Sequence, residues 1–500
     1  VRVYRAPGRI NLRGMHVDTH GGWLNLQTHH RETLVAATKT DDPVHRYANG
    51  DPAFTGVEFT LTPYLDRLAS VRQRHTPDDP AALLELADIQ AGSGLPSWGR
   101  YALGTALTAI FHGSPPDGGL RAVVWSDTVQ GASLSSSASL CVALTLAQWG
   151  RAGMTPPLAP LVHGSRQAEW FAGARVGLSD QGAVALGQPG SVLFTALWGP
   201  ELFPAPPAWH PFPEDATILI LHTFTSRHLS GSRRADYARN RFAYSMALRM
   251  LESAAAPLRG PYQPIAFSTF PEVLAAFPDN CDRLRLIANL PDSLDLADLE
   301  HRYGIFAVRE AYDRLFGDLP PAERPTRFAI RGPVLFGLAE TLRAHRFFEA
   351  LRSNDLERMG LLMRIGHDGD RVTDTAGRPY TVPTDSATIR EWIARNRPLE
   401  ECPGAYGAST PTLDRAVDTA TQAGAVGACL TGAGMGGAAL ALCRKTDAEA
   451  IRESIARCLA SDDFQRLRGR DAQPWPEDAA QTAVEENIAV AGAGILPPPA

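Results

Sequence analysis

A serine-rich loop lies between a short apolar run and a longer one in this chain of 500 residues. The loop, residues 131–139 (GASLSSSAS), follows residues 121–126, which are typical of a strand, and precedes residues 140–147, which are typical of a buried helix. Small residues at such a junction let the backbone wrap around an anion, and the helix N-terminus adds unpaired N–H groups. The pattern predicts a site for a phosphorylated ligand; the alternative is a serine N-cap on an ordinary helix.

The composition argues against several classes of protein. The chain is 44% hydrophobic, which is enough for a large core, and its length favours two or three domains. A formal net charge of −6 and the lack of a basic stripe argue against a nucleic-acid partner. No apolar run reaches about 18 residues and the chain begins like an edge strand, so neither a membrane span nor a signal peptide is expected. Six cysteines without a CxxC pair predict neither a zinc site nor a disulfide framework, and they favour a reducing cytoplasm.

Lysine is nearly absent from the sequence. The two lysines, Lys39 and Lys445, lie in neither a GxxxxGK[ST] loop nor the set of motifs that marks a protein kinase. Any nucleotide chemistry must therefore use a phosphate cradle that does not depend on lysine.

The order of patterns along the chain predicts two large units. The first covers residues 1–205, and a proline-rich stretch separates it from a second unit, residues 214–488. Within the second unit, residues 256–285 and 367–404 are irregular in pattern and are expected to be insertions or long loops. Residues 489–500 are rich in alanine, glycine and proline and are expected to form a flexible tail.

Three further motifs accompany the serine loop. Residues 6–22 read APGRINLRGMHVDTHGG, residues 177–181 read GLSDQ, and residues 431–437 read TGAGMGG. In this order the motifs resemble those of the small-molecule kinases named for galacto-, homoserine, mevalonate and phosphomevalonate kinases (GHMP kinases), and within them the galactokinases. Residues 6–22 are similar to GRxNLIGEHTDYxGG and the serine loop is similar to GxGLSSSA. Residues 177–181 are similar to GIMDQ, and residues 431–437 are similar to TGAGFGG. The resemblance covers most of the chain apart from the two irregular segments and the tail.

This resemblance implies an α+β fold of two lobes with the active site between them. The N-terminal lobe would carry a left-handed β-α-β-type phosphate loop, and the C-terminal lobe would be an α/β sandwich. It also implies ATP and Mg²⁺ as cofactors and a small sugar as substrate, with no nucleic-acid or membrane partner. The oligomeric state stays open.

Phosphoryl transfer needs a cradle for the triphosphate and a metal ion with oxygen ligands. Serine hydroxyls and the backbone of small residues supply the cradle, and Ser137 with Glu169 would hold the metal. A solvated helix carboxylate is the alternative for Glu169. The residues predicted to bind the nucleotide are Gly131, Ser133, Ser135, Ser136, Ser137 and Gly434.

Two charged residues are predicted to be catalytic. Asp180 lies 11 positions after Glu169 on a glycine-led turn, where it would accept the proton of the attacking hydroxyl or orient that hydroxyl. Arg9 would keep Asp180 ionised and stabilise charge in the transition state. A structural ion pair is the alternative for both residues.

The acceptor side is predicted from the first motif and one later tyrosine. His16 and Asp18 match positions that hold vicinal sugar hydroxyls, since an imidazole and a carboxylate can bond both. Tyr237 resembles another sugar-contacting position, with a core tyrosine on an amphipathic helix as the alternative.

Met15 departs from the galactokinase pattern. The family carries glutamate at this position, where it bonds a hydroxyl at the exocyclic end of the hexose, and a thioether cannot make that bond. Thr19 and His20 also replace the family's tyrosine and asparagine. We therefore predict that Met15 lies against an acceptor other than plain D-galactose, such as a pentose, a deoxysugar or a derivatised sugar.

The resemblance to galactokinases implies an ATP-dependent sugar kinase that acts on the anomeric hydroxyl, with an acceptor other than plain D-galactose. One alternative is a related kinase for a cyclitol, an amino sugar or a different sugar position. The other is a galactokinase-like sensor that binds sugar and nucleotide without turnover. The presence of Arg9, Asp180 and the serine loop favours an enzyme over the sensor.

Overall fold

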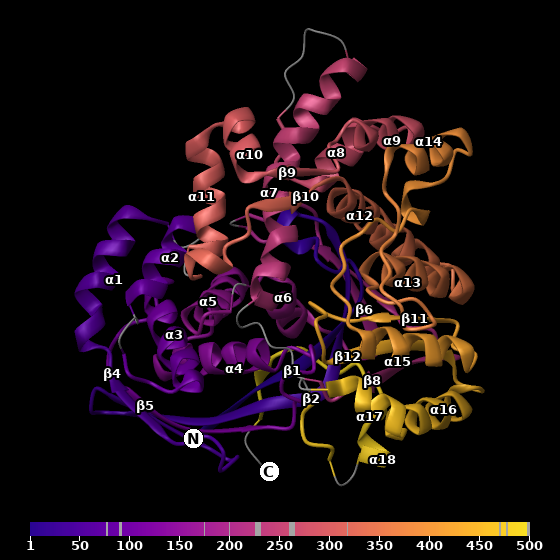
Figure 1. Cartoon of the computed structure of the whole chain (residues 1–500). Helices are drawn as coiled ribbons and strands as arrows, with labels where there is room; N and C mark the ends of the chain where they lie inside the picture. The colour runs from indigo at the N-terminus through magenta and orange to yellow at the C-terminus, as the bar shows by residue number, and fades with distance from the viewer. Residues whose placement is uncertain are drawn as a thin grey trace.

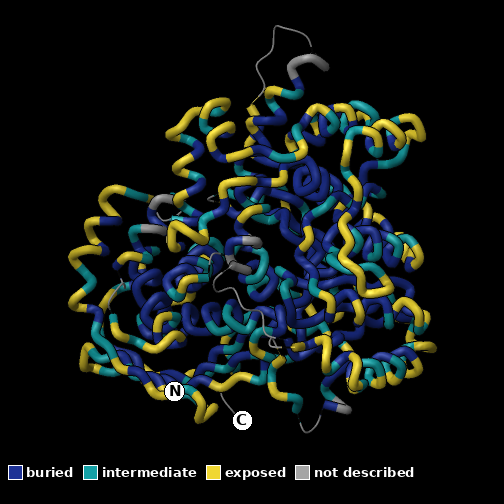
Figure 2. Tube along the Cα trace, viewed as in Figure 1, coloured by how far each residue is buried: buried dark blue, intermediate teal, exposed yellow. Residues whose placement is uncertain are grey.

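The computed structural model shows a mixed α/β chain with two main sheets, and helices cover both (Figure 1). It describes residues 1–76, 79–89, 93–174, 176–199, 201–225, 232–259, 266–317, 319–469, 472–476 and 479–497. Buried residues run through the centre, and exposed residues concentrate on the outer helices (Figure 2). In this described part of the chain, every helix is too short or too polar to cross a membrane.

The first sheet has eight strands in the order β14-β1-β2-β5-β3-β4, and β6 joins it through β2 and carries β7. Its strands are β1 (Arg2–Arg13), β2 (Trp23–Thr40), β3 (Val44–Asn49), β4 (Val57–Thr60), β5 (Gly119–Ser126), β6 (Ser191–Ala196), β7 (Ala208–Pro211) and β14 (Gly494–Ile495). The long antiparallel pair β1–β2 shifts register between Pro7 and Gly8 and again between Asn11 and Arg13. Such irregularities bend a strand and re-aim its side chains. They fall within the first motif.

Helices pack on one another and on this sheet. They are α1 (Thr62–Arg74), α2 (Pro80–Ile89), α3 (Ser97–Phe111), α4 (Ser136–Arg151), α5 (Leu158–Phe171) and α6 (Ser179–Leu186). Strand β5 and helix α4 flank the serine loop, which confirms the predicted strand–loop–helix unit. Most of α4 is buried because it packs against β1, β2, α3 and α5.

The second sheet has four strands in the order β11-β12-β8-β13. Its strands are β8 (Ala216–His222), β11 (Gly427–Leu430), β12 (Ala438–Arg444) and β13 (Val484–Glu486). Strand β8 is buried along its whole length, as its near-continuous apolar run predicts. The surrounding helices are α12 (Arg331–Arg352), α13 (Leu356–Asp370), α15 (Pro411–Gln422), α16 (Ala448–Ala460), α17 (Asp462–Arg468) and α18 (Ala479–Thr482).

A group of helices in the upper part of Figure 1 forms the remaining layer. It consists of α7 (Ser232–Arg259), α8 (Phe270–Ala276), α9 (Asn280–Ala288), α10 (Leu296–Tyr303), α11 (Ile305–Phe316) and α14 (Ser386–Ala394), with the two-stranded sheet of β9 (Ser293–Asp295) and β10 (Arg327–Ala329). The described part of the chain also contains the short 3-10 turns η1 (Asp18–His20), η2 (Pro321–Glu323) and η3 (Leu399–Glu401). The predicted long loops are therefore partly helical, because α8 and the first part of α9 lie in residues 256–285 and α14 lies in residues 367–404.

The last residues belong to the first sheet. Gly494 and Ile495 pair with Arg5 and Tyr4 of β1, and Gly492 donates its N–H to the carbonyl of Gly187 at 2.8 Å. The expected flexible tail is thus wrong for residues 489–497, since small residues let this backbone approach its neighbours closely; residues 498–500 lie outside the described part. Strands β7 and β14 add to the first sheet beyond residue 205, and the predicted unit boundaries stay a prediction.

Candidate active site

The serine loop lies against β1 and against the second glycine loop. Arg9 donates its backbone N–H to the carbonyl of Leu134 at 3.1 Å, and the Ser133 hydroxyl lies 3.4 Å from the carbonyl oxygen of Gly436. A Cβ on Gly437 would meet the backbone of Ala132 at 2.6 Å, so only glycine permits this approach. Two loops about 300 positions apart in the sequence therefore form one wall.

The backbone of the serine loop is left-handed at alternate residues. The φ angles are 71° at Gly131, 61° at Ser133 and 65° at Ser135. This conformation costs a serine free energy, and such strain is characteristic of functional sites. Backbone turns of this kind point N–H groups into a concavity that binds anions.

Ser135 occupies the N-cap position of α4 without capping it. Its side chain accepts no hydrogen bond from the helix, and its hydroxyl oxygen is buried with no partner among the residues that the structure describes. The alternative of an ordinary serine N-cap does not explain this arrangement. A phosphate oxygen would satisfy both the hydroxyl and the first N–H groups of α4, so the residues present fit a nucleotide phosphate. Ser136 and Ser137 follow at the start of the helix and are partly exposed.

The glycine loop at residues 431–437 contacts β1 at its start and Ala408 near its middle. The Thr431 hydroxyl accepts the N–H of Asn11 at 2.9 Å and donates to the carbonyl of Asn11 at 3.1 Å. Gly434 has a φ of 68° and lies so close to the carbonyl of Ala408 that a Cβ would be 2.2 Å from it. The loop is therefore a fixed part of the wall.

The two predicted metal ligands are in contact. The Ser137 hydroxyl donates to Glu169 Oε2 at 2.9 Å, and the Gln181 amide donates to Glu169 Oε1 at 2.7 Å. Glu169 is fully buried, which rules out the solvated carboxylate. A hydroxyl and a carboxylate oxygen are the hard donors that Mg²⁺ prefers, so this pair fits that ion.

The two predicted catalytic residues form an ion pair. Arg9 donates from Nε and from a terminal nitrogen to Asp180 Oδ1, at 3.0 and 2.6 Å. The other terminal nitrogen of Arg9 donates to the carbonyl of Ser133 at 2.7 Å. One buried guanidinium therefore joins the carboxylate at the start of α6 to the serine loop.

Asp18 lies next to this pair through a residue that sequence reasoning missed. The Ser179 hydroxyl donates to Asp18 Oδ2 at 2.9 Å and lies 3.3 Å from Asp180 Oδ1. A Cβ on Gly177 would collide with the Asp18 carboxylate, so glycine here lets Asp18 keep its position. The position of Ser179 beside Asp180 is the signal that could have revealed it.

His16 is held by an aromatic partner and an acidic one. Its ring stacks on Tyr406 with centroids 4.3 Å apart and planes within 8°, and its Nε2 lies 3.4 Å from Asp370 Oδ1. The residue is buried and has a φ of 67°. The structure thus places His16 beside Tyr406, away from the cavity next to Asp18.

Met15 is fully buried in the core, contrary to its predicted contact with the acceptor. The physical reason is an ion cluster behind it, in which Glu340 pairs with Arg13 at 3.3 Å and with Arg343 at 2.7 Å. Glu340 Oε1 also accepts the backbone N–H groups of Gly14 and Met15 at 2.7 and 3.3 Å. Burial alone raises the pKa of Glu340, but Arg13 and Arg343 hold it below its usual value. A buried carboxylate from another helix therefore fixes the backbone of the motif.

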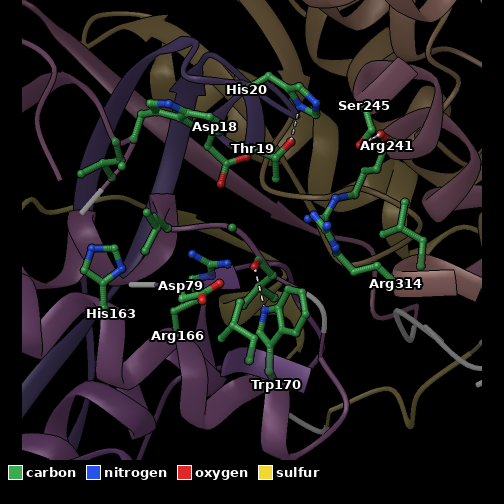
Figure 3. A pocket seen from close by; sticks show the side chains of 18 of the residues that line it. Asp18, Thr19, His20, Asp79, His163, Arg166, Trp170, Arg241, Ser245 and Arg314 are labelled. Carbon is green, nitrogen blue, oxygen red and sulfur yellow. Dashed lines mark hydrogen bonds between the residues drawn. The ribbon is translucent and has the colours of Figure 1, made fainter. Parts of the chain in front are cut away.

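A cavity of about 550 Å³ opens beside Asp18 (Figure 3). Its polar and aromatic walls include Asp18, Thr19, His20, Asp79, His163, Arg166, Trp170, Arg241, Ser245 and Arg314. Burial, and then the charge of Arg241, lower the pKa of His20 to about 3, so this imidazole is neutral at physiological pH. Tyr237 is a residue of α7, but its side chain lies outside the described part of the chain.

Comparisons with known proteins agree with this geometry. The family model described as GHMP kinases C terminal matches residues 347–461. The galactokinase of Pyrococcus furiosus is 25% identical over 459 residues, which cover 91% of this chain and 92% of that protein. The galactokinase of Streptomyces coelicolor is 24% identical over 473 residues, which cover 94% of this chain and 92% of that protein. The crystal structure of Lactococcus lactis galactokinase complexed with galactose matches the fold with a TM-score of 0.60 at 18% identity, over 99% of this chain and 94% of that one. The chain therefore contains a region similar to the C-terminal domain of the GHMP kinases, is similar to galactokinases over more than nine-tenths of its length, and shares the fold of a galactokinase.

Proposed function

We propose that this enzyme transfers the terminal phosphoryl group of ATP to the anomeric hydroxyl of a monosaccharide that is not plain D-galactose. The observation that carries the proposal is the double role of Arg9, which bonds both Asp180 and the carbonyl of Ser133. A single side chain thus joins the group that would face the acceptor hydroxyl to the loop that would hold the donor phosphates.

The donor end would bind ATP through backbone and hydroxyl groups. The unpartnered Ser135 hydroxyl and the N-terminus of α4 would bond phosphate oxygens, with Gly131, Ser133, Ser136 and the loop of Gly434 forming the walls. Ser137 and Glu169 would hold Mg²⁺. When bound, this ion neutralises charge on the phosphates.

Asp180 would face the acceptor hydroxyl. In the transfer, the hydroxyl oxygen bonds to the terminal phosphorus, the bond from that phosphorus to ADP breaks, and the hydroxyl proton passes to the Asp180 carboxylate. Arg9 keeps this carboxylate ionised and adds positive charge near the phosphoryl group. Asp18, which accepts a hydrogen bond from the hydroxyl of Ser179, the residue before Asp180, would bind a neighbouring hydroxyl of the sugar.

The acceptor end supports a sugar other than D-galactose. The glutamate of the galactokinase motif is Met15 here, and Glu340, the buried carboxylate that accepts the Met15 N–H, is already occupied by two arginines and two backbone N–H groups. Neither residue lines the cavity beside Asp18. The hydroxyl that the family's glutamate bonds would have no such partner here.

A panel of monosaccharides tests the proposal. We expect ADP release that depends on both ATP and sugar, with at least one sugar exceeding D-galactose tenfold in kcat/KM, and a phosphorus–proton NMR coupling that places the phosphate on the anomeric carbon. D-Galactose as the best acceptor by a wide margin would overturn the acceptor assignment. ATP binding without turnover of any sugar would instead favour the sensor.

A further inference from the structure

Three arginines from distant parts of the chain line the cavity beside Asp18. Arg166 comes from α5, Arg241 from α7 and Arg314 from α11. Figure 3 shows Arg166 on one side of the cavity and Arg241 and Arg314 on the opposite side. All three line the cavity and are partly exposed as whole residues.

The positive charge of Arg166 is not balanced by an ion pair. Among the residues that the structure describes, no carboxylate lies within 4 Å of its guanidinium, and its Nε is buried without a hydrogen-bond partner. The guanidinium instead lies 5.6 Å from the centre of the Trp170 ring. Burial, and then the neighbouring charge of Arg241, lower the pKa of Arg166 to about 10 against the opposing effect of the Asp18 carboxylate, and Arg166 is still charged at neutral pH.

The carboxylates around the cavity already have partners of their own. Asp18 accepts the Ser179 hydroxyl at 2.9 Å, and Asp79 bonds His75 at 2.7 Å. Glu310 pairs with Arg314 at 2.8 Å. His20 adds no charge because it is neutral.

The first motif carries one negative charge fewer than the galactokinase motif. Met15 stands where the galactokinase motif has glutamate, and the charge of Glu340 is compensated by Arg13 and Arg343 in the core. A ligand in this cavity therefore meets three arginines together with two carboxylates, Asp18 and Asp79, and Met15 adds no third carboxylate. A guanidinium binds a carboxylate or a phosphate with two parallel hydrogen bonds, which a neutral hydroxyl cannot match.

We propose that the acceptor is an anionic monosaccharide, and that Arg166 with Arg241 binds its acidic group in the cavity beside Asp18. The acidic group is a carboxylate, as in a hexuronate, or a phosphate ester, as in a hexose 6-phosphate. This inference rests on the proposed function, because it names the substrate class of the same site.

Matched sugars that differ only in the acidic group give the direct test. The purified full chain is assayed with ATP and Mg²⁺ on D-galactose, D-galacturonate and D-galactose 6-phosphate, and on the corresponding D-glucose series. We expect one acidic member to exceed its neutral partner at least tenfold in kcat/KM, and the better of the two acids identifies the group. A neutral sugar that equals or exceeds both of its acidic partners in each series overturns the proposal.

Variants of one residue then locate the binding site. Arg166→Gln is expected to lower kcat/KM for the preferred acidic sugar about 100-fold, mainly through KM, and to change the neutral sugar less than threefold. Arg166→Lys keeps the charge and should recover part of the loss. Arg302→Gln, which removes an exposed arginine outside the cavity, is the matched control and should change neither sugar. Equal losses for acidic and neutral sugars in Arg166→Gln would overturn the assignment of this residue.

Calorimetry separates this inference from the proposed function. If no sugar is phosphorylated, titration of D-galacturonate, D-galactose and D-galactose 6-phosphate in the presence of a non-hydrolysable ATP analogue still reads the charge preference. Tighter binding of an acid would keep the inference while the kinase function fails. Absence of binding by all three sugars would overturn both.

Discussion

The donor end and the acceptor end of the site differ in how their polar atoms are satisfied. At the donor end, the Ser135 hydroxyl is buried without a partner and the loop is held in a left-handed backbone. At the acceptor end, the carboxylate oxygens of Glu340 are filled by Arg13, Arg343 and two backbone N–H groups. A buried polar atom without a hydrogen-bond partner is a candidate contact for a ligand, whereas one whose partners all come from the protein has a structural role. The first motif contributes to both regions, since Gly14 and Met15 contact Glu340 whereas Asp18 lines the arginine-lined cavity.

The largest expected effect lies where the two ends meet. Asp180→Asn removes the proton acceptor and weakens the ion pair with Arg9, so kcat should fall at least about 10³-fold. ATP affinity should change less than threefold, because the serine loop is untouched. Stopped assays of ADP release and fluorescence titration of an ATP analogue measure the two quantities. Retention of a tenth of the parent kcat would show that Asp180 is only a structural partner of Arg9.

The next effect tests whether the acceptor end is a scaffold. Glu340→Ala leaves two buried arginines uncompensated and should lower the free energy of unfolding by about 3 kcal/mol. Glu349→Ala removes an exposed carboxylate from the same helix and should change the free energy of unfolding by less than about 0.5 kcal/mol. Urea denaturation measures both. Should the Glu340 variant not fold, Glu340→Gln provides the milder change, and equal stability of the Gln variant and the parent would contradict the scaffold role.

Two serines of the same helix sharpen the comparison. Ser135→Ala should raise the KM for ATP about tenfold with little change in stability, because its hydroxyl has no protein partner to lose. Ser139→Ala should leave that KM unchanged and lower the free energy of unfolding by about 1–2 kcal/mol, because its hydroxyl donates to the carbonyl of Ala6 at 2.5 Å. The opposite assignment of the two effects would show that Ser135 does not face the nucleotide.

The smallest effect is a pH dependence at the acceptor end. The folded-state pKa of Glu340 is lowered, so its contribution to stability is present above the ordinary glutamate pKa and is lost as pH falls through the folded-state value. The parent should therefore lose stability faster than Glu340→Gln as pH falls below about 4.5, by at most about 1.4 kcal/mol per pH unit. Denaturation curves at several pH values give the two slopes. Equal pH slopes of stability for the parent and the variant would mean that ionisation of Glu340 does not stabilise the folded protein.

The donor end could be predicted from sequence because its parts are consecutive. Strand β5, the serine loop and α4 follow one another within 33 residues, and local patterns specify each of them. The left-handed backbone at Ser133 and Ser135 was not predictable, because serine rarely adopts it and the neighbouring loops impose it. The contacts of Arg9 with Asp180 are geometric support for a pairing that the motif order suggested.

The acceptor end could not be predicted in the same way. Glu340 lies 325 positions from Met15, so nothing near the motif shows that a carboxylate from α12 takes up its backbone N–H groups. The arginine cavity likewise forms only when α5, α7 and α11 pack together. Helix α8 was missed although its start carries a readable signal, since Thr269 and Glu272 form a capping box.

The pairing of β14 with β1 has a consequence for the order in which the protein can be completed. The strand that carries Arg9 is synthesised long before its edge partner, Gly494–Ile495. Until those residues emerge, this edge of β1 keeps unpaired backbone groups and can pair with another chain. The strand that carries Arg9 thus lacks this edge neighbour until residue 494 has been translated, and a nascent chain stalled before that residue would expose its edge.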